Sequence, residues 1–211
     1  NIIVIRTFSF GRERRINTEG LNLTYITPSE SLGAMLDFSN QHSRRNLKLG
    51  YFDALKVFNK LKGKMYYIKP PEDKEFFIKY LMNLDDDKIE RIGRLMGIER
   101  SSGKRLLFEY IIPKISNMLG IPQKASYEDI SIAMIESLAQ AYEIERFKVY
   151  ALEELFSEIA PKFETEKAHN VANMQLLWRE VNVLPRFAKD RLLTNIASEL
   201  FGDIIKKRTA F

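Results

Sequence analysis

Residues 85–97 read Asp-Asp-Asp-Lys-Ile-Glu-Arg-Ile-Gly-Arg-Leu-Met-Gly, and this stretch indicates the fold class. Its apolar side chains recur at the three- and four-residue spacing of a helix, at Ile89, Ile92, Leu95 and Met96. The three aspartates suit the positive end of a helix dipole, and Gly97 is a favourable terminator. The stretch therefore predicts an amphipathic helix with one buried face, in a mainly α protein.

The same periodicity continues through the rest of the chain after the Pro70–Pro71 pair. Ser126 and Asp129 have the spacing of a capping box at the start of one of these helices. Pro113 and Pro161 are expected to kink or end the helices that contain them. The predicted helices span residues 72–84, about 103–119, 126–160, 164–183 and 186–207. We therefore expect a multi-helix bundle over residues 71–211.

The first 70 residues have a different pattern, with strand-like runs at 2–10, 21–26 and 64–69. The simplest arrangement is a β-hairpin with an Arg-rich connection, extended to three strands by residues 64–69. Thr27, Pro28 and Glu30 resemble a helix start, which predicts a short helix to about Phe38. The polar run 39–43 is expected to break the pattern before a second helix at 47–61. Residues 1–70 are thus predicted to be a small basic α+β head, with a domain boundary at Pro70–Pro71.

Composition excludes several classes of site. The chain has 211 residues and no cysteine, which rules out disulfides, zinc–thiolate centres, iron–sulfur clusters and cysteine nucleophiles. No apolar run reaches the ~18 residues needed to cross a bilayer. We therefore expect no membrane partner and a cytoplasmic location.

Positive charge is concentrated in the predicted head. Residues 1–70 hold 12 Lys and Arg against five Asp and Glu, a net charge of +7, whereas the whole chain carries +5. Such asymmetry is a pointer to an anionic partner, although a solvated basic surface without a partner is the alternative.

The basic side chains of the head form three clusters that could neutralise phosphates. A fourth basic pair follows Ser101 and Ser102 at a predicted helix N-terminus, a place that favours phosphate. Phe8, Phe10, Tyr51, Tyr66 and Tyr67 are interleaved with the clusters and could stack on bases, but core packing is the plainer interpretation for each. The candidate nucleic-acid-binding residues are Arg12, Arg14, Arg15, Arg44, Arg45, Lys48, Lys60, Lys62, Lys64, Lys104 and Arg105.

Several short stretches resemble motifs for catalysis or metal binding, but each departs from the required pattern. Residues 97–105 have five residues between the glycines, and Arg105 follows Lys104 where a P-loop has Ser or Thr. Residues 85–90 lack the ligand spacing and central glycine of a calcium loop. Glu166 and His169 have the spacing of a di-iron carboxylate motif, but a second such pair is absent, and no orienting acid can be named for His42. We therefore expect no catalytic residues, metal or cofactor.

Three functions stay open at this point. The first is a non-catalytic RNA- or DNA-binding protein, a subunit of a larger nucleoprotein assembly, that binds phosphates through its head. The second is a helical protein–protein interaction or scaffold protein, whose apolar helix faces bind a partner chain or a second copy. The third is an enzyme with an unrecognised site.

Overall fold

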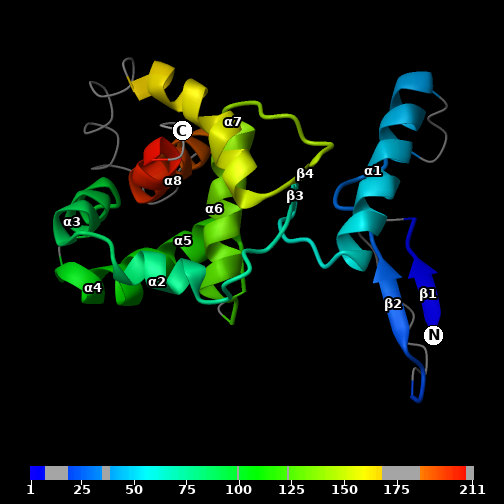
Figure 1. The fold of residues 1–211 in the computed structure, drawn as a ribbon, viewed down its shortest axis with the longest axis horizontal. Coiled ribbons are helices and arrows are strands. Elements are labelled where there is room, and N and C mark those ends of the chain that lie inside the picture. The colour runs from blue at the N-terminus through cyan, green and yellow to red at the C-terminus, as the bar shows by residue number, and fades with distance from the viewer. Residues whose placement is uncertain (8–18, 35–38, 99, 123, 168–185, 208–211) are drawn as a thin grey trace. The chain divides into compact units, whose positions relative to one another are not determined.

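The computed structural model describes residues 1–7, 19–34, 39–98, 100–122, 124–167 and 186–207. It is mainly helical with a small amount of strand, as the periodicity predicts (Figure 1). The chain forms two compact units. The first unit comprises Asn1–Pro70 together with Glu145–Tyr150, and the second comprises Pro71–Ile144 and Ala151–Phe211.

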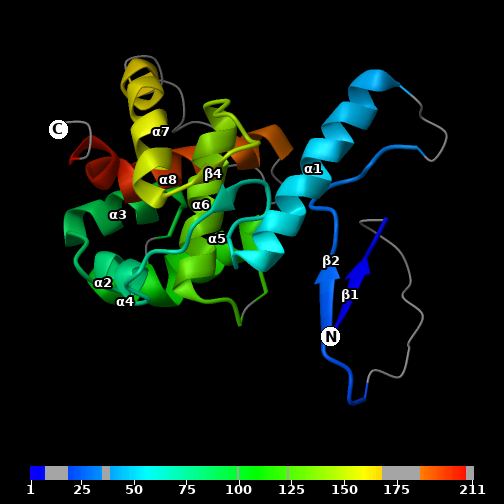
Figure 2. The same cartoon turned by 45° about the vertical axis from the view of Figure 1, so that its right-hand side comes forward.

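A two-stranded parallel sheet opens the first unit. Strand β1, Ile2–Ile5, pairs with β2, Leu23–Ile26, in a register that runs from Ile2 opposite Leu23 to Ile5 opposite Ile26. The two arrows point the same way in Figure 2. The predicted hairpin is therefore wrong. A parallel pair needs a crossover rather than a tight turn, and residues 6–22 are long enough to supply one.

The third predicted strand exists, but it does not join this sheet. Strand β3, Tyr67–Ile68, pairs in parallel with β4, Val149–Tyr150, in a second two-stranded sheet. One residue beyond β3, the Lys69 N–H donates to the Tyr150 carbonyl at 2.8 Å. The expected three-stranded head sheet is therefore two separate pairs, one of which uses a strand from far along the chain.

Helix α1, Asn40–Phe58, begins seven residues earlier than expected. The polar run that was expected to break the helix instead opens it, because the Ser39 hydroxyl caps the helix by accepting from the His42 N–H at 3.2 Å. The short helix expected after Thr27 is absent over residues 27–34, and residues 35–38 lie outside the described residues. Instead of forming a capping box, Ser29 and Glu30 make long-range contacts, Ser29 with Asp53 and Glu30 with Arg146.

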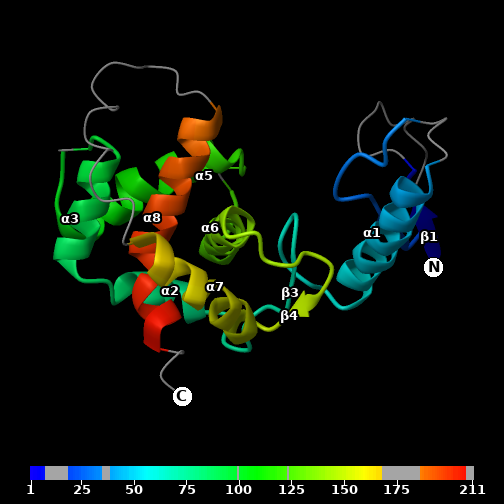
Figure 3. The same ribbon diagram turned by 90° about the horizontal axis from the view of Figure 1, so that it is seen from above.

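The second unit is helical (Figure 3). Helix α6 lies centrally, in contact with α2, α5, α7 and α8. The Tyr80 ring stacks on Phe201, 5.7 Å between centroids, and its hydroxyl donates to the Leu200 carbonyl at 2.6 Å. The elements are α2 Phe76–Met82, α3 Asp86–Leu95, α4 Gly103–Leu106, the π-helical turn η1 Leu107–Ile111, α5 Ile112–Leu119, α6 Tyr127–Ala141, α7 Leu152–Lys167 and α8 Arg186–Lys207.

The prolines act differently from one another. Pro113 lies in the first turn of α5, directly after the π-helical turn, which accommodates a residue that cannot donate a backbone hydrogen bond. Pro161 lies inside α7, which continues to Lys167, so of the two expected effects, an end or a kink, the end is wrong. Of the predicted helix 164–183, residues 168–185 lie outside the described residues, whereas 186–207 is helical as predicted.

The long helix predicted over 126–160 is two helices. The capping box of Ser126 and Asp129 is present and starts α6. The helix ends at Ala141, and Glu143 adopts a left-handed backbone with φ of 51°. Residues 145–150 then leave the second unit, form β4 and return to begin α7 at Leu152. No helix among the described residues is long and apolar enough to cross a membrane.

Candidate functional site

The first unit is organised around one buried carboxylate. Asp53, on α1, is 3% exposed. Its Oδ2 accepts from the Ser29 N–H at 2.8 Å, and its Oδ1 accepts from the Tyr67 hydroxyl at 3.2 Å. A buried carboxylate is costly unless such donors satisfy it. Asp53 therefore connects α1 to the segment after β2 and to β3.

Arg146 adds a second group of polar contacts to this cluster. Its guanidinium donates to the Glu30 carboxylate at 2.6 Å, to the Ser29 hydroxyl at 3.1 Å and to the Met65 carbonyl at 2.7 Å. Glu30 also pairs with Arg45 on α1. Segment 145–150 is thus held in the first unit by a planar group in which each of the three nitrogens donates to an acceptor.

Tyr67 is completely buried in the same cluster. Burial, as the larger cause, and the nearby Asp53 carboxylate together raise the pKa of its hydroxyl to about 12. At neutral pH the hydroxyl therefore keeps its proton and donates it in the hydrogen bond to Asp53. This arrangement favours a structural role for the cluster, since each group is already paired with another.

The opposite face of α1 has a different character. Asp53 is the only acidic residue of the helix, and because it is buried, the exposed surface of α1 carries no acid. Arg44 and Lys48 are exposed, one turn apart, and neither forms an ion pair with any residue that the structure describes. Tyr51, 63% exposed, lies one turn beyond Lys48. We call Arg44, Leu47, Lys48, Tyr51 and Phe58 the α1 face.

The other predicted cations of the first unit are dispersed. Arg45 is occupied by Glu30. Lys60 is exposed just after α1, with a left-handed backbone at φ of 52°. Lys62 is half-buried, and its backbone forms a bridge with Ile68, while Lys64 is exposed. Arg12, Arg14 and Arg15 lie outside the described residues, so their role stays a prediction.

Lys104 and Arg105 belong to the second unit, where both have partners. The Lys104 ammonium donates to the Leu84 carbonyl and lies 3.9 Å from the Asp86 carboxylate. Arg105 pairs with Glu109 one turn along the helix, at 2.9 Å. Both cations therefore serve contacts within the second unit.

Other lysines of the second unit also bind carbonyls where helices end. Lys114 donates to Met96 at the end of α3, at 2.7 Å, and Lys162 donates to Tyr142 at the end of α6, at 2.5 Å. Cations are favourable there because the helix dipole is negative. These contacts show that basic residues of the second unit serve its own fold.

Five aromatic side chains were candidates for base stacking. Tyr66 and Tyr67 are buried and belong to the core, so for these two the alternative of core packing is correct. Tyr51 is the exception among the described residues. Phe8 and Phe10 lie outside them.

Sequence reasoning missed Arg146 and Lys148, because it placed them inside a long helix. A signal was available. Residues 145–150, Glu-Arg-Phe-Lys-Val-Tyr, contain aromatic and β-branched residues that alternate with charged ones, which is typical of a strand.

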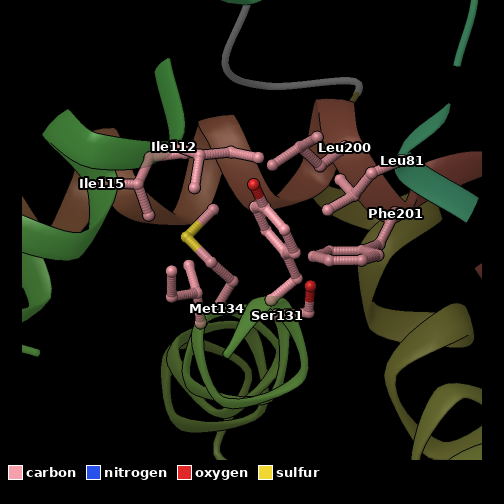
Figure 4. Close-up of a pocket in the computed structure, with 9 residues that line it drawn as sticks. Leu81, Ile112, Ile115, Ser131, Met134, Leu200 and Phe201 are labelled. Atoms are coloured by element: carbon pink, nitrogen blue, oxygen red, sulfur yellow. The ribbon is translucent and has the colours of Figure 1, made fainter. Parts of the chain in front are cut away.

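A pocket in the second unit lies between α2, α5, α6 and α8. Figure 4 shows Ile112, Met134 and Leu200 pointing into it. Its lining offers the hydroxyls of Ser131 and Tyr127 but no carboxylate, amine or imidazole, so it holds no acid–base pair. Among the described residues there is also no group of three or more His, Asp or Glu side chains that could hold a metal ion.

Comparison of the chain with protein-family models, curated proteins and solved structures finds no significant match.

Proposed function

We propose that this chain is a non-catalytic nucleic-acid-binding protein, a subunit of a larger nucleoprotein assembly, that binds phosphates through its first unit. The observation that carries the proposal is the α1 face, on which Arg44 and Lys48 are exposed and pair with no acid among the residues that the structure describes. Cations without acidic neighbours attract a polyanion most strongly, because no internal ion pair must be broken first.

The charge distribution supports the same function. Residues 1–70 carry a net charge of +7, and segment 145–150 adds two bases and one acid to the first unit. In the second unit, Lys88 pairs with Asp203 and Arg91 lies 3.5 Å from Glu199, and the lysines described above bind helix ends. Several cations of the second unit are thus paired within that unit, whereas the first unit carries a net positive charge.

The test is a fluorescence-anisotropy titration of the full chain with labelled RNA and DNA, starting at about 50 mM salt. We expect binding whose log K falls linearly with log salt, since binding releases counterions from the phosphates. Arg44→Gln with Lys48→Gln should weaken binding and reduce the salt slope by about one unit per lost phosphate contact.

The matched control is Arg94→Gln with Lys124→Gln, which removes the same charge from exposed positions of the second unit. Equal weakening by both pairs would show that net charge alone acts. Absence of binding to either polymer at about 50 mM salt would refute the proposal.

A second candidate, protein–protein interaction, rests on β1. Ile2, Ile3 and Ile5 are all exposed, on both faces of a two-stranded sheet. The N–H groups of Ile2 and Arg6 donate toward β2, so those of Ile3 and Ile5 point to the other edge of the strand. Such an edge suits pairing with another strand.

Light scattering tests this candidate. If the protein is monomeric at all concentrations, and if Ile3→Lys and Ile5→Lys do not change its association state, the result argues against protein–protein interaction through β1.

A further inference from the structure

The residues of the α1 face lie on one side of the helix. A rotation of 100° per residue places Arg44, Leu47, Lys48, Tyr51 and Phe58 within an arc of about 100°. The same rotation places Asp53 about 180° from Arg44, on the side that contacts Ser29 and Tyr67. The α1 face therefore combines two cations with two aromatic rings and excludes the helix's one acid.

Tyr51 is supported within this face. Its ring meets Phe52 edge-on, with centroids 5.3 Å apart and an interplanar angle of 89°. Phe52 in turn packs against Tyr67 at 5.0 Å and Phe147 at 5.8 Å. The exposed ring thus rests on a side chain that is anchored in the first unit, which lowers the entropy lost when a ligand covers it.

We propose that the α1 face binds single-stranded nucleic acid, with Tyr51 stacking on a base while Arg44 and Lys48 hold phosphates of the same strand. This inference rests on the function proposed above and specifies the ligand as single-stranded rather than duplex nucleic acid. The reason is chemical: most side chains of the face are apolar or aromatic and offer a surface for the faces of bases, not hydrogen bonds to their edges. Bases of a single strand expose those faces, whereas bases of a duplex are stacked on one another.

Charge complementarity selects nucleic acid over a protein segment as the occupant. An apolar protein helix could cover Leu47 and Phe58, but it would leave Arg44 and Lys48 without acidic partners unless it supplied them. A single strand provides a phosphate with every base, so one ligand satisfies both the cations and the rings.

The experiment compares a single strand of about 16 nucleotides, the upper site size of compact single-strand-binding folds, with a duplex of the same sequence. The variants are Tyr51→Leu, which keeps apolar bulk without the ring, and Tyr51→Phe, which keeps the ring. We expect Tyr51→Leu to raise Kd for the single strand about fivefold to a hundredfold, the range for loss of one stacked base. Tyr51→Phe should retain the affinity within about twofold. Thermal melts check that both variants are folded.

The outcomes separate this inference from the proposed function. If Tyr51→Leu binds the single strand as the unchanged chain does, while Arg44→Gln with Lys48→Gln weakens binding, the stacking is wrong and the proposed function stands. Tighter binding of the duplex would likewise overturn the single-strand assignment. If neither polymer binds, both proposals fail, and a protein partner becomes the better occupant of the α1 face.

Discussion

The guanidinium of Arg146 lies 2.6 Å from the carboxylate of Glu30, although 116 residues separate them in the sequence. Both side chains are mostly buried, and Arg45 reaches the same carboxylate from α1. One carboxylate thus joins α1, the segment after β2 and the segment that returns from the second unit. We therefore expect these ion pairs to stabilise the first unit.

Arg146→Met should therefore destabilise the first unit, by about 2–4 kcal/mol, because it removes the buried guanidinium from the Met65 carbonyl and leaves Glu30 with Arg45, which is 43% exposed, as its remaining ion partner among the described residues. Hydrogen exchange measured by mass spectrometry should show faster exchange at residues 23–34 and 145–150. Lys148→Met is the control on the same segment, and we expect less than about 1 kcal/mol there, since its ammonium lies 5.0 Å from the Tyr150 ring. Equal effects of the two variants would contradict the role given to Arg146.

The raised pKa of Tyr67 leads us to expect that the stability of the protein falls at high pH. The folded protein raises the pKa of this hydroxyl to about 12 from an ordinary value of 10.0, so the folded state holds the proton more tightly than the unfolded chain. The resulting stabilisation is complete below pH 10 and is lost as the pH rises through about 12, by at most about 3 kcal/mol. Urea unfolding between pH 9 and 12 measures this loss.

Tyr67→Phe removes the ionisable group and the hydrogen bond to Asp53. At neutral pH we expect it to cost about 1 kcal/mol. Between pH 10 and 12 the variant should lose less stability than the unchanged chain, so the two curves converge. Parallel curves over that range would show that the hydroxyl does not titrate as its burial implies.

Two helical glycines should respond in opposite directions to alanine. A Cβ at Gly50, on α1, would meet no atom within 4 Å, so Gly50→Ala should stabilise the protein by about 0.5–1 kcal/mol through helix propensity. A Cβ at Gly93, on α3, would lie 2.9 Å from Leu106 Cδ2 and 3.3 Å from the Ile98 carbonyl oxygen. Gly93→Ala should cost about 1–3 kcal/mol. Thermal melts of both variants measure the difference. Stabilisation by both would show that Leu106 moves away from a Cβ at position 93 at little cost.

The next prediction concerns the arginines between β1 and β2. Replacing Arg12, Arg14 and Arg15 together with Ala should change stability little, within about 0.5 kcal/mol each, because we predict that these side chains reach outward from the fold. We expect the triple variant to weaken nucleic-acid binding similarly across sequences, and more than Arg44→Ala with Arg45→Ala, because Arg45 is already paired with Glu30. Anisotropy titrations at several salt concentrations measure both affinity and slope. An unchanged affinity and slope in the triple variant would remove these residues from the contact surface.

Much of the second unit could be predicted because its signals are local. The stripe of Ile89 and Ile92 gave α3, the capping box at Ser126 gave the start of α6, and the last helix has the predicted bounds. Helix propensity, caps and periodicity act over a few residues, so a single sequence carries them. The α1 face was only partly foreseen: Arg44, Lys48 and Tyr51 were candidates, but nothing local shows that Asp53 is buried.

The sequence by itself determined the helical class, the concentration of positive charge in the first 70 residues and the absence of cysteine chemistry. Only the tertiary structure decided that β1 and β2 are parallel, that Ser29 and Glu30 serve long-range contacts instead of a capping box, and that residues 145–150 belong to the first unit, where Val149–Tyr150 form a strand beside β3. The physical reason is the same in each case. Strand direction and buried polar pairing depend on partners distant in the chain, such as Arg146 for Glu30, and those partners override the local preference of the segment.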